Sequence, residues 1–462
     1  MKKEFVLCLI GLMCLFCIDA YPENKQQKIA VSAEIPAFPG AEGWGMFSKG
    51  GRGGDIIKVT NLNDSGPGSF REAVMHTEPR IVIFTVSGTI DLKSEIIITS
   101  PYLTIAGQTA PGDGICLKNY PLDIQDTHDI IIRSIRVRPG IESGLIGSEL
   151  DAIELRNSEN VIIDHCSFSW SNDEGINTWH NNRSTTVQWC LMSDPLNKSV
   201  HEKGAHGFSA SIGGFKLSFH HNILANGAGR NPSIGGNSDH STVFLDFRNC
   251  LISNWEHRTC DGKPLSINVV NNYFKPGPAT KESVRRRIVN IDNSEKLGFS
   301  GLWHIEGNYV EGYPEISADN WNGGVDFSEG TSQERNRSIK PFETAPVITQ
   351  SAQDAYILLL DHAGCIFPKR DLQDDRVIEQ IRTGKYPGGG NGMIDRVEQA
   401  GGWSLLKSVP YPVDRDGDGI PDEWEKANGL NPDDLSDALR IAPNGYMNIE
   451  NYINSLIPDP YK

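Results

Sequence analysis

The chain has 462 residues, of which 38 % are hydrophobic and 22 % are charged, and its formal net charge is −16. This composition can bury a sizeable core and excludes a wholly disordered chain, while the length is typical of two or three domains. The negative charge argues against an extended nucleic-acid surface, so no nucleic-acid partner is expected. The 47 Gly and 26 Pro follow no triplet period, which excludes collagen and predicts many turns.

The N-terminus has the pattern of a segment that directs export. Two lysines precede an apolar run of 14 residues, which is too short to cross a membrane as a helix. Charge before this run and polar residues after it predict a signal peptide over 1–20, followed by a linker over 21–36. We therefore expect a secreted or periplasmic protein without a membrane span. A lipid anchor on Cys14 or Cys17 is the less favoured alternative, because a large residue precedes each of them.

Similar short segments recur along the middle of the chain, each with alternating apolar residues and a Cys or Asn at the same place. They cover residues 161–168, 185–192, 217–224, 245–252, 267–274 and 303–310. Constant strand sequence with variable spacing predicts an all-β solenoid, a parallel β-helix whose loops differ in length. In such a stack the Cys and Asn side chains lie one above another, and a buried Asn bonds to its neighbours. We therefore expect most cysteines to be buried rather than disulfide-bonded, although their even number permits disulfides.

The open ends of a solenoid need a cover. The spacing of Ser69 and Glu72 after Pro67-Gly68 is that of a capping box, and it predicts a short helix from Ser69 to Met75 over the N-terminal end. We assign the β-helix domain to 37–405 and a small C-terminal module to 406–462.

Four short motifs in the central region carry a resemblance to a known family. They are Val-Ile-Ile-Asp-His-Cys at 161–166, Asp-Glu-Gly at 173–175, His-His-Asn at 220–222 and Arg-Asn-Pro at 230–232. In this order they resemble the pectate lyases of polysaccharide lyase family 1. The segments 38–45 and 61–68 resemble its exported bacterial branch. The resemblance covers roughly 37–403 and implies a right-handed parallel β-helix that cleaves polygalacturonate, or pectin, by calcium-dependent β-elimination.

The resemblance also implies a calcium site. The reaction removes a proton next to a carboxylate, and a cation on that carboxylate neutralises the charge that develops. Asp151, Asp173 and Asn177 lie where the family has calcium-binding carboxylates, and calcium takes several oxygen ligands. Asn177 is an amide where the family has an Asp, so Glu174 is a candidate substitute.

Arg230 matches the arginine that the family uses as its base. Because arginine is ordinarily protonated, this role requires nearby cations or a concerted proton transfer. A second departure from the family is Gly235, which stands where the motif has another arginine. We therefore expect the substrate to bind through Lys203, His206 and Arg248.

Residues 414–425 contain a second candidate calcium site. Their sequence matches the loop D-x-D-x-D-G with a Glu at position 12, and Gly419 permits the sharp turn. Short helices are predicted over 423–428 and 448–456. No catalytic residue accompanies the loop, so we expect a structural role. The expected ligands are the side chains of Asp414, Asp416, Asp418, Asp422 and Glu425 and the carbonyl of Ile420.

Two other functions are compatible with the sequence. A β-helix glycoside hydrolase of pectin would use two carboxylates beside the scissile bond, and Asp173 and Glu174 could serve. A non-catalytic β-helix that binds cell-wall glycans would not need Arg230. Only a lyase forms an unsaturated product that absorbs ultraviolet light. We expect a monomer in each case.

Overall fold

A computed structural model describes residues 34–140, 149–235, 242–293, 301–386 and 390–461. The expected signal peptide and nearly all of the linker lie outside these residues. From Ile35 onward the chain forms one compact unit. No helix among the described residues has both the length and the apolar character needed to cross a membrane.

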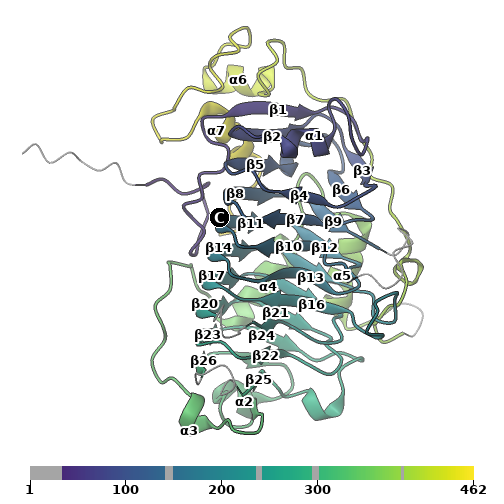
Figure 1. Cartoon of the computed structure of the whole chain (residues 1–462), viewed down its shortest axis with the longest axis vertical. Coiled ribbons are helices and arrows are strands. Elements are labelled where there is room, and N and C mark those ends of the chain that lie inside the picture. The colour runs from purple at the N-terminus through teal and green to yellow at the C-terminus, as the bar shows by residue number, and fades with distance from the viewer. Residues whose placement is uncertain (1–33, 141–148, 236–241, 294–300, 387–389, 462) are drawn as a thin grey trace, which may run out of the picture. The chain divides into compact units, whose positions relative to one another are not determined.

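The strands form three parallel sheets, in which each strand pairs with the equivalent strand of the next coil (Figure 1). Sheet A consists of β1 (Asp55–Val59), β2 (Arg80–Phe84), β5 (Leu103–Ala106), β8 (His128–Arg133), β11 (Glu159–Asp164), β14 (Arg183–Gln188), β17 (Phe215–His220), β20 (Val243–Arg248), β23 (Ser266–Val270) and β26 (Leu302–Glu306). Sheet B consists of β3 (Gly88–Asp91), β6 (Ile115–Lys118), β9 (Arg136–Arg138), β12 (Ser167–Ser169), β15 (Leu191–Ser193), β18 (Ile223–Ala225), β21 (Leu251–Ser253), β24 (Tyr273–Lys275) and β27 (Tyr309–Val310). Sheet C consists of β4 (Ile96–Ile98), β7 (Leu122–Gln125), β10 (Ile153–Arg156), β13 (Glu174–His180), β16 (Phe208–Ile212), β19 (Ser233–Ile234), β22 (Cys260–Gly262), β25 (Val289–Ile291) and β28 (Val325–Phe327). The expected parallel β-helix is confirmed.

Helices cover the ends and the outer faces of this stack. The α-helices are α1 (Phe70–Met75), α2 (Pro314–Ala318), α3 (Gln333–Asn336), α4 (Ala352–His362), α5 (Leu372–Thr383), α6 (Asp422–Asn428) and α7 (Asn448–Ser455). Helix α1 begins where the sequence predicts, since the Ser69 hydroxyl accepts a hydrogen bond of 3.2 Å from the Glu72 amide. Its buried side chains belong to the interior cluster, so it covers the first coil.

A ladder of side-chain hydrogen bonds joins the coils at the turn from sheet A to sheet B. The amide oxygen of Asn222 accepts from the Cys190 backbone amide at 2.8 Å, and that of Asn272 accepts from Cys250 at 2.8 Å. The ladder continues from Asn272 through Asn308 at 2.9 Å. The six cysteines of the described chain are free and buried. The predicted Cys/Asn stack is therefore confirmed.

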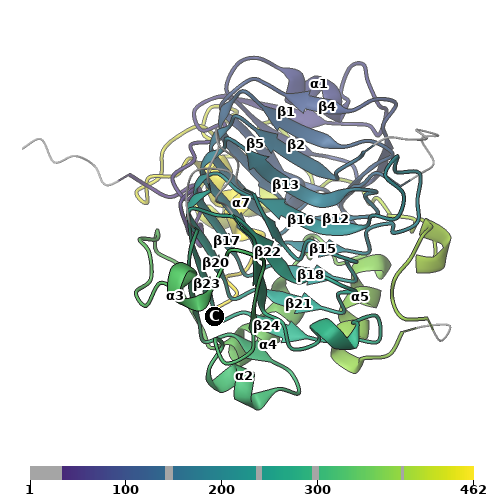
Figure 2. The ribbon, with the colours of Figure 1, turned by 60° about the horizontal axis from the view of Figure 1, so that its bottom comes forward.

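The C-terminal part of the chain returns along the outside of the β-helix. Helices α4 and α5 pack against the outer face of sheet B, where their leucine, valine and isoleucine side chains contact residues of β15, β18 and β21 (Figure 2). The segment that contains α6 and α7 packs on the outer face of sheet A, against β2 and β5. The boundary expected after residue 405 stays a prediction.

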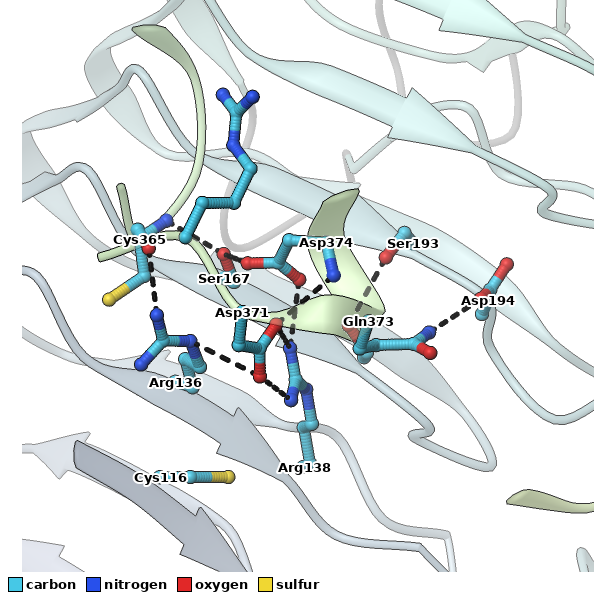
Figure 3. A network of polar contacts seen from close by, with 12 residues as sticks. Cys116, Arg136, Arg138, Ser167, Ser193, Asp194, Cys365, Asp371, Gln373 and Asp374 are labelled. Atoms are coloured by element: carbon cyan, nitrogen blue, oxygen red, sulfur yellow. Dashed lines mark hydrogen bonds and ion pairs between the residues drawn. The ribbon is translucent and has the colours of Figure 1, made fainter. Parts of the chain in front are cut away.

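A buried ionic network fixes the start of α5 to sheet B (Figure 3). Arg138 of β9 donates to both oxygens of Asp371 at 2.6 and 3.1 Å and to Asp374 at 2.8 Å. The second oxygen of Asp374 accepts from the Ser167 hydroxyl at 2.6 Å, and Arg136 lies 3.5 Å from Asp371. Since each of these charged side chains is at most 3 % exposed, the two arginines and two aspartates neutralise one another away from water.

Breaking this network from one side should be strongly destabilising. Arg138→Met leaves Asp371 and Asp374 buried with one cation instead of two, and we expect a loss of about 3–5 kcal/mol in the free energy of unfolding. Urea unfolding followed by circular dichroism measures it. The double variant Arg138→Met, Asp371→Asn should lose less than the sum of the single variants. Arg183→Met, at an exposed position at the start of β14 in sheet A, is the control. The network would be contradicted if the losses of the single variants add up in the double variant, or if Arg138→Met loses no more stability than Arg183→Met.

Candidate active site

The candidate site lies where strands of four successive coils begin in sheet C, namely β10, β13, β16 and β19. Asp151 stands just before β10, Glu174 is the first residue of β13, and Arg230 precedes β19. Parallel pairing in register, with Ile153 opposite Ile176, brings these positions together although they are far apart in the chain. The Arg230 carbonyl extends the pairing, since it accepts from the Ala210 amide at 3.0 Å.

Three carboxylates and one guanidinium meet there. Oxygen atoms of Asp151, Asp173 and Glu174 lie within 4.8 Å of one another. The Glu174 amide donates to Asp151 at 2.8 Å, and the Ser211 hydroxyl donates to Glu174 at 2.6 Å. Arg230 forms an ion pair with Glu174, and its Nη1 lies 3.5 Å from Asp173 Oδ1. The structure thus brings together three of the four expected calcium ligands and the expected base.

Burial and mutual repulsion dominate the electrostatics of these carboxylates. Burial and then the nearby Glu174 charge raise the pKa of Asp173 to about 8, and the same two causes raise the pKa of Asp151 well above its usual range. Burial also opposes ionisation of Glu174, but a hydrogen bond with Asp173 and the Arg230 charge together lower its pKa. Such a set of buried oxygen ligands fits calcium, because a divalent cation replaces the protons that the carboxylates otherwise hold.

The Asn177 amide is turned away from the centre of this cluster. Its nitrogen donates to Asp151 Oδ2 at 3.1 Å, and its oxygen accepts from the Trp179 backbone amide at 3.1 Å. Asn177 therefore supports Asp151 from the side, and the third carboxylate of the cluster comes from Glu174. Position 177 alone could not reveal this, because the orientation of an amide depends on which backbone donor lies beside it.

Two histidines, His201 and His206, form a second group with Asp173. The Nε2 atoms of His201 and His206 each lie 3.5 Å from an Asp173 oxygen, and the two rings stack at 3.8 Å. Burial, followed by the neighbouring His201 and Arg230, lowers the pKa of His206 to about 4, so its ring is neutral at pH 7. His206 was expected at the site from the sequence, whereas His201 was not, since its only signal is its position five residues earlier in the same loop.

Lys203 and Arg248, the other two expected substrate-binding residues, lie farther from the carboxylate cluster than His206, and in different places. Lys203 lies at the rim of the site, where its ammonium is 2.5 Å from Glu149 and its side chain is 58 % exposed. Arg248 ends β20 in sheet A and holds Asp246 through two bonds of 2.6 and 2.7 Å. The structure does not bring Arg248 to the carboxylate cluster, because strand alternation predicts the side of a strand but not which of the three sheets it joins.

Trp179 occupies the space beside the second departure from the family pattern. A Cβ atom added to Gly235 would lie 2.1 Å from Cδ1 of the Trp179 ring. No side chain fits at position 235 while Trp179 keeps this position. The ring is half-buried in sheet C, two residues after Asn177, so an aromatic surface stands where the family has an arginine.

The C-terminal loop gathers a ligand set that differs from the expected one. Asp414, Asp416 and Asp418 come together, and Asp418 also meets Glu425 and Asp437. Asp422 does not join them, because its carboxylate accepts from Arg415 at 2.7 Å and lies 3.4 Å from Lys426. Asp422 is therefore replaced by Asp437 in the cluster. Ile420 lies in the loop with a fully buried side chain.

The similarity of this chain to known proteins extends over nearly its whole length. No family model matches it. A curated protein from Aspergillus fumigatus named "Probable pectate lyase C" is 33 % identical over 439 residues, which cover 94 % of this chain and 96 % of that protein. A protein of the same name from Neosartorya fischeri is 33 % identical over 440 residues, with the same two coverages.

A solved structure agrees with the fold, and the curated relatives establish the family. The cedar pollen allergen jun a 1 superposes with a TM-score of 0.50 at 18 % identity, covering 70 % of this chain and 92 % of that one. The two curated relatives described above are fungal, so they do not support the expected exported bacterial branch. A sequence identity of one third over almost the full length of both chains nevertheless establishes the family to which the chain belongs. The chain belongs to the pectate lyase family.

Proposed function

We propose that the protein is a pectate lyase that cleaves polygalacturonate by calcium-dependent β-elimination. The observation that carries this proposal is the position of Arg230 against the partly exposed carboxylates of Asp151 and Asp173 and the buried carboxylate of Glu174. These three residues would hold Ca²⁺, which when bound supplies positive charge beside the substrate carboxylate. Sequence similarity to proteins named pectate lyase over nearly the full length of both chains supports the same activity. We also propose that the protein is exported and acts as a monomer.

The elimination assigns a definite task to Arg230. To act as the base, Arg230 must be in its neutral guanidine form when it accepts the proton from C5 of the galacturonate ring, and the electron pair of that C–H bond forms the C4–C5 double bond. The C4–O bond breaks, the leaving oxygen takes a proton from solvent, and Arg230 later returns its proton to solvent, so no water is consumed. Phe208 positions the guanidinium, whose carbon lies 4.3 Å from the centre of the Phe208 ring. His201 and His206, which lie beside Asp173, and the exposed Lys203 are candidates to bind the polyanionic substrate.

The arrangement of the carboxylates supports β-elimination better than hydrolysis. A glycoside hydrolase needs one carboxyl group on each side of the scissile bond, at least about 5 Å apart. Here the three carboxylates converge on one point, with oxygens within 4.8 Å, and two of them contact the same arginine. Convergent carboxylates are typical of a cation site. The ultraviolet absorbance of an unsaturated product, measured on polygalacturonate with and without a chelator, tests the proposal directly.

Arg230→Lys tests the base. The shorter ammonium cannot reach the same point, so we expect kcat to fall at least about a hundredfold, the usual scale for a lost general base. Arg183→Lys in sheet A should retain turnover and serves as the matched control. Circular dichroism and thermal unfolding should be unchanged in both variants. Turnover near the wild-type level in folded Arg230→Lys would rule out this role.

Asn177→Asp tests the calcium cluster. The new carboxylate would face Asp151, where the Asn177 amide nitrogen now lies 3.1 Å from Oδ2. Since this adds negative charge that a divalent cation relieves, we expect a lower calcium concentration for half-maximal rate. Initial rates over a calcium titration measure it. A requirement that stays the same or rises would show that position 177 does not influence the metal.

The replacement of an arginine by Gly235, with the Trp179 ring beside it, suggests which substrates the enzyme prefers. A missing arginine costs less when the substrate has fewer free carboxylates, and the Trp179 ring offers an apolar surface instead. We therefore propose that the enzyme tolerates partly methylated pectin better than a pectate lyase that retains this arginine.

Trp179→Ala tests this preference. It should lower kcat/KM on partly methylated pectin more than on polygalacturonate, because only the apolar surface is lost. Phe215→Ala, which removes an exposed aromatic ring from sheet A, should leave the ratio of the two values unchanged. An equal loss of Trp179→Ala on both substrates would count against substrate discrimination by this ring.

A further inference from the structure

Five carboxylates from three segments of the C-terminal part form two overlapping groups. Asp414, Asp416 and Asp418 come from the loop before α6, Glu425 lies on α6, and Asp437 follows α6. Oxygens of the three loop residues lie within 4.8 Å of one another, and the same holds for Asp418, Glu425 and Asp437. Asp418 belongs to both groups and therefore joins them into one cluster.

Several of these carboxylates are buried without a hydrogen-bond donor. Glu425 is 0 % exposed, and neither of its oxygens has a hydrogen-bond partner among the described residues. Asp418 and Asp437 are 2 % and 1 % exposed, and one oxygen of each likewise has no partner there. An ionised carboxylate buried in this way is strongly unfavourable unless a cation compensates it.

The nearby cationic side chains are engaged at the edge of the cluster. Arg415 and Lys426 are directed to Asp422, at 2.7 and 3.4 Å. Lys58 of β1 reaches Asp414 at 2.6 Å. The ion pairs found among the described residues therefore leave Glu425 and Asp437 without a cationic side chain.

The cluster is built directly on the first coils of the β-helix. A Cβ atom on Gly419 would lie 2.6 Å from Cδ1 of Ile83 in β2, so the loop touches sheet A through its glycine. The Ile420 side chain packs with Ile81, Ile83 and Ile449 in one buried cluster. The segment with α6 accordingly lies beside β1 and β2 (Figure 1). The position of the loop is thus coupled to the sheet on which it rests.

We propose that Asp414, Asp416, Asp418, Glu425 and Asp437 bind one structural Ca²⁺ that fastens the C-terminal segment to the first coils. Five hard oxygen ligands without histidine or cysteine favour calcium over zinc or copper, and their number and charge favour calcium over the more hydrated magnesium. This site is separate from the carboxylates beside Arg230, and it does not depend on the proposed lyase activity.

The test uses the full chain with Asp173→Asn as the background, because this change weakens the other carboxylate cluster. In chelator-treated protein, Ca²⁺ at a hundredfold excess over its Kd should raise the unfolding midpoint by about 3 °C. Calcium should also protect residues 406–462 from limited proteolysis. Calorimetry should find one tight Ca²⁺ per chain. Mg²⁺ at the same concentration should give a smaller rise, and an equal rise would overturn the choice of metal.

Three further variants in this background identify the ligands. Glu425→Gln and Asp437→Asn should each weaken calcium binding by more than about tenfold and remove most of the rise in the midpoint. Asp422→Asn should keep both, because Asp422 pairs with Arg415 rather than with the cluster. The proposal is overturned if Asp437→Asn binds calcium as before or if Asp422→Asn abolishes the rise. If Glu425→Gln fails to fold, Asp437→Asn alone decides.

A failure of this proposal can be told apart from a failure of the proposed function. Wild-type protein that does not cleave polygalacturonate but still gains stability from calcium would contradict the lyase activity alone. Protein with Asp173 intact that cleaves pectate but shows no separate calcium effect on residues 406–462 would contradict the structural site alone.

Discussion

In-register pairing of parallel strands is the constraint on which the rest of the molecule depends. Each coil must place its strands opposite those of the next coil, so side chains at equivalent positions form columns along sheets A, B and C. The column of Cys and Asn holds the turns together inside the stack. On sheet C the same register brings Asp151, Glu174 and Arg230 to one point. Local strand geometry thus determines both the core and the chemistry.

Features with a local signal were predictable from the sequence. The repeated strands, the Ser69 cap of α1 and the acidic loop at 414–418 each depend on residues close together in the chain, and the structure agrees with each. The resemblance to pectate lyases added Asp151, Asp173 and Arg230. The helices α4 and α5 were not predicted, because their buried faces are complementary to a sheet formed by distant residues.

Sequence spacing does not tell which side chains neutralise each other, and this explains why some expected site residues lie elsewhere in the structure. Arg248 was expected at the substrate but pairs with Asp246 two positions earlier. Asp422 fits the spacing of a calcium loop, yet Arg415 competes for it, while Asp437 takes its place from beyond α6. His201 was not expected at the site, because no residue near it in the sequence indicates that Asp173 lies beside it in the fold.

The return of the C-terminal segment to the first coils has a kinetic consequence. Arg52 and Glu450, which pair at 2.8 Å, are separated by 398 positions in the chain. Contacts of such long range form slowly, because a long loop must close before they contribute any stability. The coils of sheet A therefore have to form first and keep an apolar outer face uncovered until the last part of the chain arrives. For that interval the uncovered apolar face exposes the protein to aggregation, and folding is complete only when the segment that contains α6 and α7 has packed on it.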